Sequence, residues 1–584
     1  MPPEAVTVAD CAREPIHLSG AIQPHGYLVS CQVSDWTIRH ASANVEALFG
    51  VAPGALAGET LREHVAAEVL VAIADTVGFL DAGATAQRVG TANLGVHGTL
   101  CDLSVHVADG LVHIEAEPLP QFGTQPATPT ATAQAMIARL GSGEDEVAFL
   151  DGVATQVRAL SGYDRVMVYR FRDDDAGEVV AESAADDLEP YLGLRYPASD
   201  IPPQARALYL RNRIRVIPDA SYVPVPIVPG LLANGRPMDL GGHALRSVSP
   251  VHLEYLRNMG VAASMSISII AGGRLWGLVA CHHRAPRLVP PAARAALDLF
   301  GMFVSMRVSA HEQQQTMAGY ERAERIREQL RQRLAGAADF NAALAAELGT
   351  LQEALRCDGA ALWAGARWHT AGSVPDPREA AGLLAWLQHA DAGASVLATD
   401  AAADWHSIQA FDESMRDEGV VDGGVAGVLA LCLGGREDWL LLFRNEQRQD
   451  VRWAGEPGKA LVPSDDGVRI APRRSFATWQ ELVRGRSLPW SDADRRAAER
   501  LHMLLHEARR RMLSRDGDQG DLEGRARRRL LGEQRRRLGD LSQLLEGLVH
   551  LGGDETAALD HRIRELEAEL RGLMDRRPEP VLGA

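Results

Sequence analysis

Charged and hydroxyl side chains gather in a short stretch near the middle of the chain. Residues 246–268 read RSVSPVHLEYLRNMGVAASMSIS and supply Arg246, His252, Tyr255, Ser264 and Ser266. The two serines are two residues apart, so a strand would point both hydroxyls to one face. A lone histidine here is more often a core residue, but an arginine with nearby hydroxyls offers the donors that a carboxylate binds. The stretch predicts a binding site for a carboxylate. Arg215 would add a second cation to this site.

A second polar motif, PASDIP, covers residues 197–202. Taken by itself, it predicts the start of a helix, with Ser199 or Asp200 as the N-cap and Pro202 in the first turn. On this interpretation the motif is structural and carries no chemistry.

The elements that would position these residues form an α+β unit from about 136 to 308. The sequence predicts a helix (AFLDGVATQVRALSG), a strand (RVMVYRF), a helix after PASDIP, and two strands, SMSISIIAGG and RLWGLVACHH, joined at Gly272-Gly273. Residues 221–242 are too rich in proline and glycine for regular structure. A loop of that length inside a compact domain is usually functional.

Another α+β unit precedes this one. Residues 20–118 alternate in short segments and end in a hairpin signal at Asp109-Gly110. The Pro, Thr and Ala composition of residues 121–134 predicts a linker between the two units.

The C-terminal half is predicted to be helical around a third sheet. A long helix is expected over 293–336, followed by strands GAALWAG and AGVLALCLGGREDWLLLFRNE, an irregular arm at 451–490 and a helix at 492–513. Apolar residues recur at heptad spacing over 538–573, on both sides of Gly552-Gly553. Two short helices cannot bury two apolar stripes alone, so a dimeric four-helix bundle is predicted.

Composition and cysteine spacing exclude several classes of protein. The 584 residues are 46% hydrophobic with a net charge of −17, so neither wholesale disorder nor nucleic-acid binding is expected. The six cysteines form no CxxC pair, and we assign neither a disulfide framework nor a metal site. Without a signal peptide or a long apolar run, the chain is expected to be cytoplasmic and to have no membrane partner.

The ordered motifs DRVMVYRF, RYPASDIP, RSVSPVHLEYLRNMGV, LWGLVACHH and PRRSF resemble the photosensory core of bacteriophytochromes, and DCAREPIHLSGAIQPHG is similar to that family's chromophore-attachment segment. The resemblance covers about residues 8–502. It implies an α+β multidomain fold of PAS, GAF and GAF-like PHY sheet domains, with a figure-of-eight knot between PAS and GAF, long connecting helices and a C-terminal helical hairpin or coiled coil. The expected divisions are an attachment segment at 1–20, a PAS domain at 21–122, a linker at 123–135, a GAF domain at 136–308, a PHY domain at 309–502 and a helical dimerisation and output region at 503–584.

The family binds a linear tetrapyrrole, and the resemblance implies biliverdin IXα for this chain. Cys11 would form a thioether with the ring A vinyl group. In plant-type and many cyanobacterial relatives the attachment cysteine immediately precedes the motif histidine, where this chain has Val251. Biliverdin is therefore favoured over phycocyanobilin. Cys31 and Cys101 are expected to be buried in strands.

The resemblance also implies a set of residues around the chromophore. Asp200 and His252 would lie by the pyrrole nitrogens, and Arg215 and Arg246 would hold the ring B propionate. His282 would hydrogen-bond the ring D carbonyl, whereas His283 would point to the other side of its strand. The other residues implied to bind the chromophore are Tyr169, Tyr196, Ile201, Pro202, Tyr209, Ser249, Tyr255, Ser264 and Ser266.

Two long segments gain roles from the resemblance. The arm at about 451–490 would be the PHY tongue, in which Arg473 pairs with Asp200 in one state and Ser475 replaces it in the other. The tongue segment VRWAG departs from the family's Trp-Gly-Gly pattern at Ala454.

The loop 221–242 would form a lasso through which the N-terminal segment passes near Ile22. Such a knot is rare among folds.

The expected function is a red/far-red photoreceptor and not an enzyme. Only 82 residues follow position 502, too few for a histidine kinase, and GGDE at 552–555 is interpreted as a helix break. The arginine clusters 527–529 and 535–537 are balanced by acidic residues, which favours a solvated helix face. The expected partners are a second copy of the chain and an unidentified signalling protein.

Two alternatives remain open. One is a light-regulated signalling enzyme of the histidine kinase type, with its catalytic part cryptic in 503–584 or supplied by a partner. The other is a PAS–GAF protein that binds haem or a metabolite.

Overall fold

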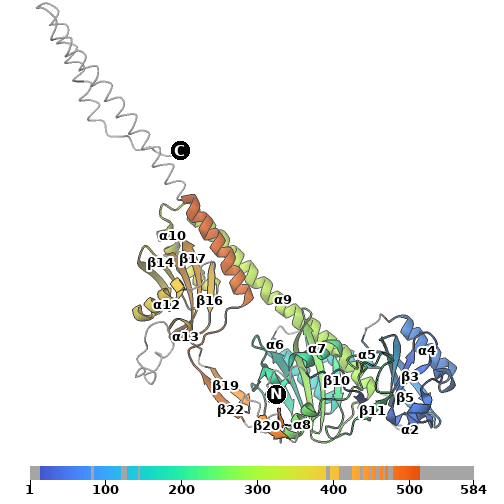
Figure 1. The fold of residues 1–584 in the computed structure, drawn as a ribbon. Coiled ribbons are helices and arrows are strands. Elements are labelled where there is room, and N and C mark those ends of the chain that lie inside the picture. Colours follow the sequence, from blue (N-terminus) through green and yellow to red (C-terminus); the bar gives the residue numbers. More distant parts are fainter. Residues whose placement is uncertain are drawn as a thin grey trace, which may run out of the picture. The chain divides into compact units, whose positions relative to one another are not determined.

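The computed structural model describes residues 14–80, 85–119, 128–141, 145–389, 395–406, 424–434, 438–447, 449–455, 461–464, 467–470, 478–512 and 568. The chain divides into two compact units, of which the first combines Met1–Gln315 with Gln449–Val483 and the second combines Thr316–Arg448 with Arg484–Ala584. Figure 1 labels their elements. Within the described residues, no helix combines the length and the apolar character that crossing a membrane requires.

The first unit contains two sheets, of which the N-terminal one has seven strands. They are β1 (Ala21–Ile22), β2 (Tyr27–Gln32), β3 (Ile38–Ser42), β4 (Gln87–Leu94), β5 (Thr99–Ala108), β6 (Leu111–Pro118) and β11 (Val225–Val228), in the order β1-β11-β3-β2-β6-β5-β4. Short helices accompany this sheet: α2 (Glu46–Phe49), α3 (Pro53–Leu56) and α4 (Ala67–Gly78). Cys31 and Cys101 are fully buried in β2 and β5, as expected.

The hairpin between β5 and β6 follows from its turn residues. Asp109 and Gly110 have φ angles of 51° and 75°, the left-handed pair that a two-residue type I′ turn requires. Their backbone twist matches that of the flanking strands, so the register of the hairpin is set locally.

Strand β11 corrects one expectation from the sequence. The loop 221–242 was expected to lack regular structure, yet Val225–Val228 pairs with β1 on one side and with β3 on the other. Each neighbour pairs with only two residues of β11, so the missing N–H of Pro226 removes little of the ladder.

The second sheet of this unit has eight strands. They are β7 (Arg165–Phe171), β8 (Gly177–Ala184), β9 (Arg195–Tyr196), β10 (Ile214–Ile217), β12 (Ala263–Ala271), β13 (Arg274–His283), β19 (Gln449–Ala454) and β22 (Thr478–Val483), in the order β10-β12-β13-β7-β8-β9-β19-β22. Its helices are α5 (Pro129–Arg139), α6 (Glu146–Ser161), α7 (Pro203–Arg211), α8 (Pro250–Asn258) and the N-terminal part of α9 (Pro291–Ala335). The apolar faces of α5, α6 and α9 pack against inward side chains of β7, β12 and β13 in one core.

The start of α7 corrects a second expectation. Ser199 and Asp200 belong to a short 3-10 turn, and the N-cap of α7 is Pro202. A proline disfavours the helical conformation in the residue that precedes it. Because Pro202 follows Ile201 and Pro203 follows Pro202, neither Ile201 nor Pro202 can begin the helix. The helix therefore begins later than the polar residues of PASDIP indicated.

The second unit is built on one antiparallel sheet. Its strands are β14 (Gly359–Ala364), β15 (Arg367–Gly372), β16 (Val396–Thr399), β17 (Val425–Gly434) and β18 (Asp438–Asn445), in the order β15-β14-β18-β17-β16. The C-terminal part of α9, α10 (Phe340–Ala346), α11 (Leu348–Ala354) and the helix over 492–512 share one core with the sheet. The helices α12 (Pro377–His389) and α13 (Ala403–His406) contribute to a second core.

The two remaining strands, β20 (Leu461–Ser464) and β21 (Gly467–Ile470), pair with each other. The heptad runs predicted over 538–573 lie outside the described residues, apart from the isolated residue 568.

Candidate functional site

A pocket of about 1030 Å³ of empty space, its open mouth included, lies beside α7 and α8 of the first unit. Its lining combines apolar side chains with a few polar and charged groups, which is typical of sites that bind organic ligands. Of the fourteen residues that the sequence implied for the chromophore, nine line it: Asp200, Ile201, Pro202, Tyr209, Arg215, Arg246, Ser249, His252 and Tyr255.

Arg215 and Arg246 bring two buried cations to this pocket. Strand β10 carries Arg215, whose Nη1 donates to the Ala244 carbonyl at 2.9 Å, and Arg246 Nη1 donates to the Ile16 carbonyl at 2.9 Å. Arg246 Nε is buried without a hydrogen-bond partner. Among the described residues, no carboxylate forms an ion pair with either guanidinium.

The electrostatics of the pair favour an anion in the pocket. Burial, and then the neighbouring Arg215 cation, lower the pKa of Arg246 to about 9. Burial also lowers the pKa of Arg215. Buried like charges are costly until an anion compensates them, so the arrangement suits a ligand with carboxylate groups.

Helix α8 places His252 and Tyr255 on one side, three residues apart. Their rings are 12° from parallel, with centroids 6.0 Å apart. The Tyr255 hydroxyl donates to Oδ2 of Asp200 at 3.0 Å. Burial, followed by the positive charges of Arg215 and Arg246, lowers the pKa of His252 to about 4, so its ring is neutral near pH 7.

The remaining predicted residues lie on the sheet, outside the lining described above. Strand β12 pairs Ser264 with His282 of β13 and Ser266 with Arg215 of β10. The His282 ring is buried, its Nδ1 has no hydrogen-bond partner, and burial lowers its pKa to about 3. Strand alternation therefore brings the two serines and His282 to neighbouring positions of the sheet.

Tyr169 and Tyr196 form an aromatic group on the same sheet. Their ring centroids are 5.7 Å apart, and both pack in a cluster with Ile201 and Tyr209. A Cβ added at Gly177 would lie 1.7 Å from the Tyr169 ring, so only glycine leaves room for this ring. The sequence analysis did not single out Gly177, because its partner is on another strand.

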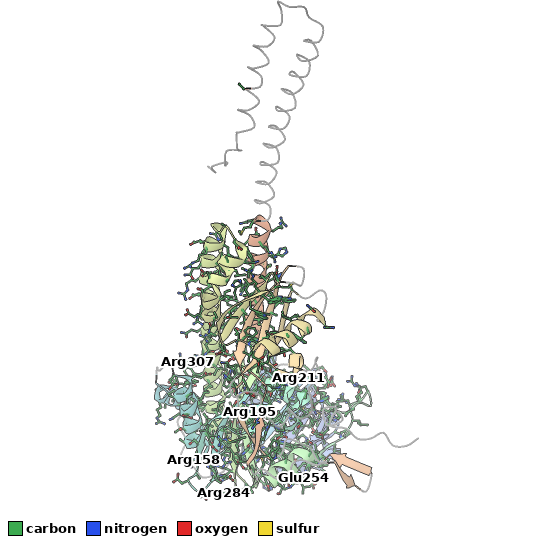
Figure 2. The ribbon with its side chains drawn as sticks, turned by 90° about the vertical axis from the view of Figure 1, so that its left-hand side faces the viewer. Arg158, Arg195, Arg211, Glu254, Arg284 and Arg307 are labelled. Atoms are coloured by element: carbon green, nitrogen blue, oxygen red, sulfur yellow. The ribbon has the colours of Figure 1, made fainter. Side chains whose placement is uncertain are left out.

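His283 points away from His282, as strand alternation predicted. Its Nδ1 lies 2.8 Å from Oδ2 of Asp164, and Arg284 contacts the same carboxylate at 3.3 Å. Figure 2 labels Arg284 among the side chains of the first unit.

The sequence analysis missed one acidic residue of the pocket. Glu14 lines it, and its Oε2 accepts a hydrogen bond from the Ser249 hydroxyl at 3.1 Å. The residue stands within DCAREPIHLSG, but nothing in that spacing shows which side chain turns inward. Cys11, three residues earlier, lies outside the described residues.

The arm at 451–490 reaches the sheet through β19. Trp453 pairs in parallel with Arg195 of β9, which is labelled in Figure 2, and Arg452 donates to the Leu192 carbonyl at 3.1 Å. Ala454 is fully buried in the cluster that contains Tyr196. Arg473 and Ser475 lie outside the described residues.

The N-terminal segment lies between part of the loop that was predicted to form a lasso and the residues just after that loop. Ala21 and Ile22 pair with β11, while Gln23 N donates to the Leu245 carbonyl at 2.7 Å and Ser247 N donates to the Ala21 carbonyl at 2.9 Å. Residues 225–226 of the predicted lasso and residues 245–247 beyond it therefore contact this segment on two sides.

Three family models match successive parts of the chain. They are described as a PAS fold at residues 11–119, a GAF domain at 145–308 and a Phytochrome region at 323–514.

Curated relatives match most of the chain. It is 40% identical to a bacteriophytochrome of Pseudomonas aeruginosa over 86% of this chain and 67% of the relative. Identity is 35% to cyanobacterial phytochrome B of Nostoc sp., over 86% of this chain and 66% of the relative. It is 34% to a bacteriophytochrome of Xanthomonas campestris pv. campestris, over 87% and 79%. The chain thus spans about two thirds of the length of the first two of these relatives.

Solved structures agree with these matches. A bacteriophytochrome from the photosynthetic bacterium R. palustris superposes with a TM-score of 0.70 at 32% identity, covering 86% of this chain and 99% of the other. The wild-type phytochrome photosensory core module of Stigmatella aurantiaca gives a TM-score of 0.71 at 35% identity, covering 87% and 99%.

Proposed function

The chain belongs to the phytochrome family, with PAS, GAF and PHY domains, and on this premise we propose that it is a red/far-red photoreceptor carrying biliverdin IXα on Cys11. The observation that supports this most directly is the pair of buried guanidiniums at one pocket, Arg215 and Arg246. Biliverdin is an elongated tetrapyrrole with two propionates, so its negative charge complements the two cations.

The chain's own residues would hold such a ligand at four places. Arg215 and Arg246 bind one propionate, and the Ser264 and Ser266 hydroxyls take the other. His252, neutral in the empty pocket, presents a ring nitrogen to the pyrrole N–H groups. At the far end His282 offers the buried Nδ1 that has no partner within the protein.

When bound, the bilin supplies light absorption and an isomerisation about its C–D methine bridge. The protein responds through contacts near that end of the pocket. His282 would hydrogen-bond ring D in one state only, and the Tyr169 and Tyr196 rings, which share a cluster with Ala454 of β19, would repack. Asp200 would exchange Arg473 for Ser475 of the tongue, and the conformation of the tongue would change.

The output would pass along α9, one helix that runs from the first unit into the second. We propose that the chain forms a homodimer through residues 503–584, works in the cytoplasm, and signals by partner binding or a change in dimer geometry. A catalytic role is not required by this proposal. ATP turnover or autophosphorylation by the pure protein would favour the kinase-type alternative instead.

The deciding experiment mixes the purified bilin-free chain with biliverdin and records absorption in the dark and after red and far-red light. Reversible photoconversion supports the proposal. Absence of bilin uptake, with retained haem binding, would overturn it in favour of a haem protein.

The anchor is tested with Cys11→Ser, analysed on a denaturing gel by zinc-induced bilin fluorescence. The covalent band should disappear in this variant and persist in Cys432→Ser, a matched control at a partly exposed thiol of the second unit. A covalent band that survives Cys11→Ser would show that another thiol carries the bilin.

A further inference from the structure

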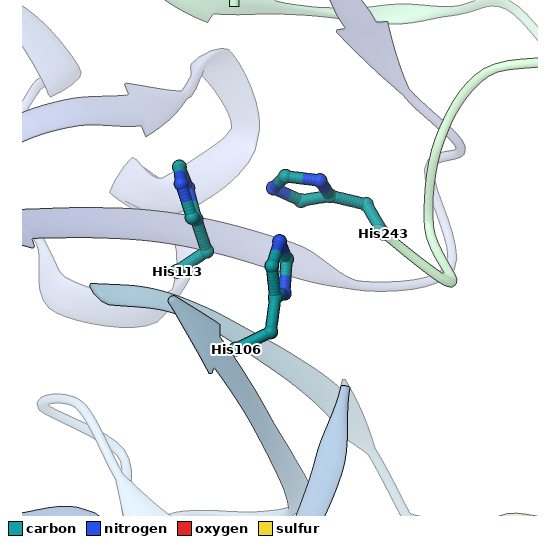
Figure 3. A group of neighbouring side chains, drawn as sticks. All are labelled: His106, His113 and His243. Carbon is teal, nitrogen blue, oxygen red and sulfur yellow. The ribbon is translucent and has the colours of Figure 1, made fainter. Parts of the chain in front are cut away.

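Three histidines from distant parts of the chain meet inside the first unit (Figure 3). His106 on β5 pairs directly with His113 on β6, and His243 comes from the segment just after the loop 221–242. All three are buried, and their ring nitrogens lie within 4.8 Å of one another.

The ring nitrogens of this histidine cluster are short of partners. Among the described residues, no well-aligned hydrogen bond reaches a ring nitrogen of His106 or of His243, although the His243 ring approaches the Leu240 carbonyl. The His113 ring has two polar neighbours: its Nδ1 lies 2.8 Å from the Ser30 hydroxyl, and its Nε2 lies 3.3 Å from the Ala108 carbonyl. Buried polar atoms are nearly always paired, so ring nitrogens without a well-aligned hydrogen bond, gathered in one place, indicate a missing partner.

Ring packing alone does not account for the arrangement. The His106 and His113 rings stack with centroids 4.7 Å apart, and the His243 ring stands edge-on to both at 4.2 and 4.7 Å. Apolar rings would give the same packing without burying unpaired nitrogens.

We propose that His106, His113 and His243 bind one divalent transition-metal ion of the zinc class. Three imidazole nitrogens leave a fourth position of a tetrahedral ion for water. Water can reach it through the cavity that His106 lines together with Asp239 and Gly242.

Neighbouring residues support the ligands. With Nε2 on the ion and released from the Ala108 carbonyl, the Ser30 hydroxyl would accept the Nδ1 proton of His113 and hold the ring. A Cβ at Gly242 would come within 3.3 Å of the His106 ring, so glycine lets the loop approach this ring.

The ion would clamp the β5–β6 hairpin to the segment just after the loop 221–242. Glu115, two residues after His113, already joins the same elements by accepting hydrogen bonds from Ala244 N at 3.0 Å and Leu245 N at 2.7 Å. Metal binding would therefore stabilise the junction of the two sheets, independently of the bilin pocket.

The test uses the full bilin-free chain, because biliverdin itself chelates zinc. Chelator-treated protein is titrated with Zn²⁺ in competition with a chromogenic chelator, and with Co²⁺ to observe visible bands of a tetrahedral site. We expect one tight equivalent, a Co²⁺ spectrum of tetrahedral nitrogen coordination, and a higher thermal midpoint with Zn²⁺.

The affinity for Zn²⁺ should fall by more than about 100-fold in His243→Gln and in His106→Gln. Loss of a residue that only hydrogen-bonds to a metal ligand already lowers metal affinity roughly 10–100-fold, and these variants remove a ligand itself. The affinity should be unchanged in His97→Gln, which alters an exposed histidine between β4 and β5. Wild-type protein without a tight equivalent, or with one that both cluster variants retain, overturns the proposal. The wild-type titration decides the matter even if the variants fold poorly.

Discussion

At the scale of single residues, the bilin-free pocket holds two buried guanidinium groups whose positive charges repel each other. Arg215 and Arg246 are 8% and 7% exposed, and each uses part of its guanidinium on backbone carbonyls. These neutral acceptors do not compensate the positive charges. A carboxylate therefore binds the two guanidiniums more strongly in the pocket than it would at the surface.

The first prediction concerns Arg246→Gln. Loss of one charge-assisted contact of about 1.5–3 kcal/mol should weaken biliverdin binding roughly 10–100-fold. The thermal midpoint of the bilin-free protein should not fall, because a buried like-charge contact is relieved. Biliverdin titration in a Cys11→Ser background, where binding is reversible, measures the affinity.

The matched control is Arg211→Gln. This arginine ends α7, is largely exposed and does not line the pocket. Equal affinities for Arg246→Gln and Arg211→Gln would contradict a role of Arg246 in binding a propionate.

The second prediction is a loss of stability in mild acid. Burial lowers the pKa of six histidines in the folded chain: His25, His106, His113, His243, His252 and His282. Below about pH 6.5 the histidines of the unfolded chain become protonated, whereas the buried rings of the folded chain stay neutral. The free energy of unfolding therefore falls as the pH drops from about 6.5 toward 4. Glu115, whose pKa burial raises to about 7, and Asp102, whose pKa burial also raises, act in the opposite direction, but they are two groups against six.

Thermal unfolding of the bilin-free, metal-free protein at pH 7.5 and 5.5 measures this effect. The midpoint should be lower at pH 5.5, and His282→Gln should reduce the slope by up to about 1.4 kcal/mol per pH unit. A midpoint that is equal or higher at pH 5.5 would be incompatible with neutral buried rings.

At the scale of elements, strand β19 is the point where the arm joins the pocket's sheet. Only one residue pair, Trp453 with Arg195, links β19 to β9. The burial of Ala454 beside Leu194 and Tyr196 must therefore carry much of the docking.

The third prediction is that Ala454→Asp releases β19 from this sheet. A buried, unpaired carboxylate costs a few kcal/mol or more, which exceeds what one strand pair supplies. Limited proteolysis should cut the arm faster, while circular dichroism of the remainder stays unchanged.

Its control, Thr478→Asp, places the same charge directly across the hairpin, at an exposed position of β22. Proteolysis at wild-type rates in both variants would mean that Ala454 does not hold the strand.

At the scale of the whole molecule, the N-terminal segment couples the two sheets of the first unit. Ile22 is fully buried, pairs with Val225 of β11 and forms a bridge with Arg246. Its core neighbours are Leu28 of β2 and Leu240 and Leu245 of the segment that precedes α8, and the adjacent Gln23 Nε2 donates to the Val216 carbonyl of β10 at 3.0 Å.

The fourth prediction is that Ile22→Ala destabilises both sheets together, by about 2–5 kcal/mol. Calorimetry should show one transition of the first unit moving to lower temperature. Val223→Ala, at an exposed position of the same loop, should leave it in place. Separate transitions, with only one shifted by Ile22→Ala, would show that the sheets unfold independently.

Much of the second sheet could be predicted from the sequence. The strands around RVMVYRF, SMSISIIAGG and RLWGLVACHH follow from apolar and polar alternation, and β7 has the predicted bounds of 165–171. The turn at Asp109-Gly110 was equally predictable, since only a few residue types accept its φ angles. These features depend on neighbours a few residues away.

The site divides in the same manner. Motif order indicated Arg215, Arg246 and His252, and the structure brings all three to one pocket. Motif order did not indicate Glu14, because its hydrogen-bond partner Ser249 is 235 residues away in the chain. The start of α7 was misplaced because the constraint of Pro202 and Pro203 on their predecessors outweighs a favourable capping residue.

The sequence by itself determined the order of the domains, the alternation of the strands and the residues whose types suit a bilin. Only the tertiary structure decided that β11 joins the first sheet and that His243 meets His106 and His113. The physical reason is the range of the contacts involved. Strand alternation and turn preference depend on residues that are close in the sequence. A contact between residues more than a hundred positions apart depends on the path of the whole chain between the two residues.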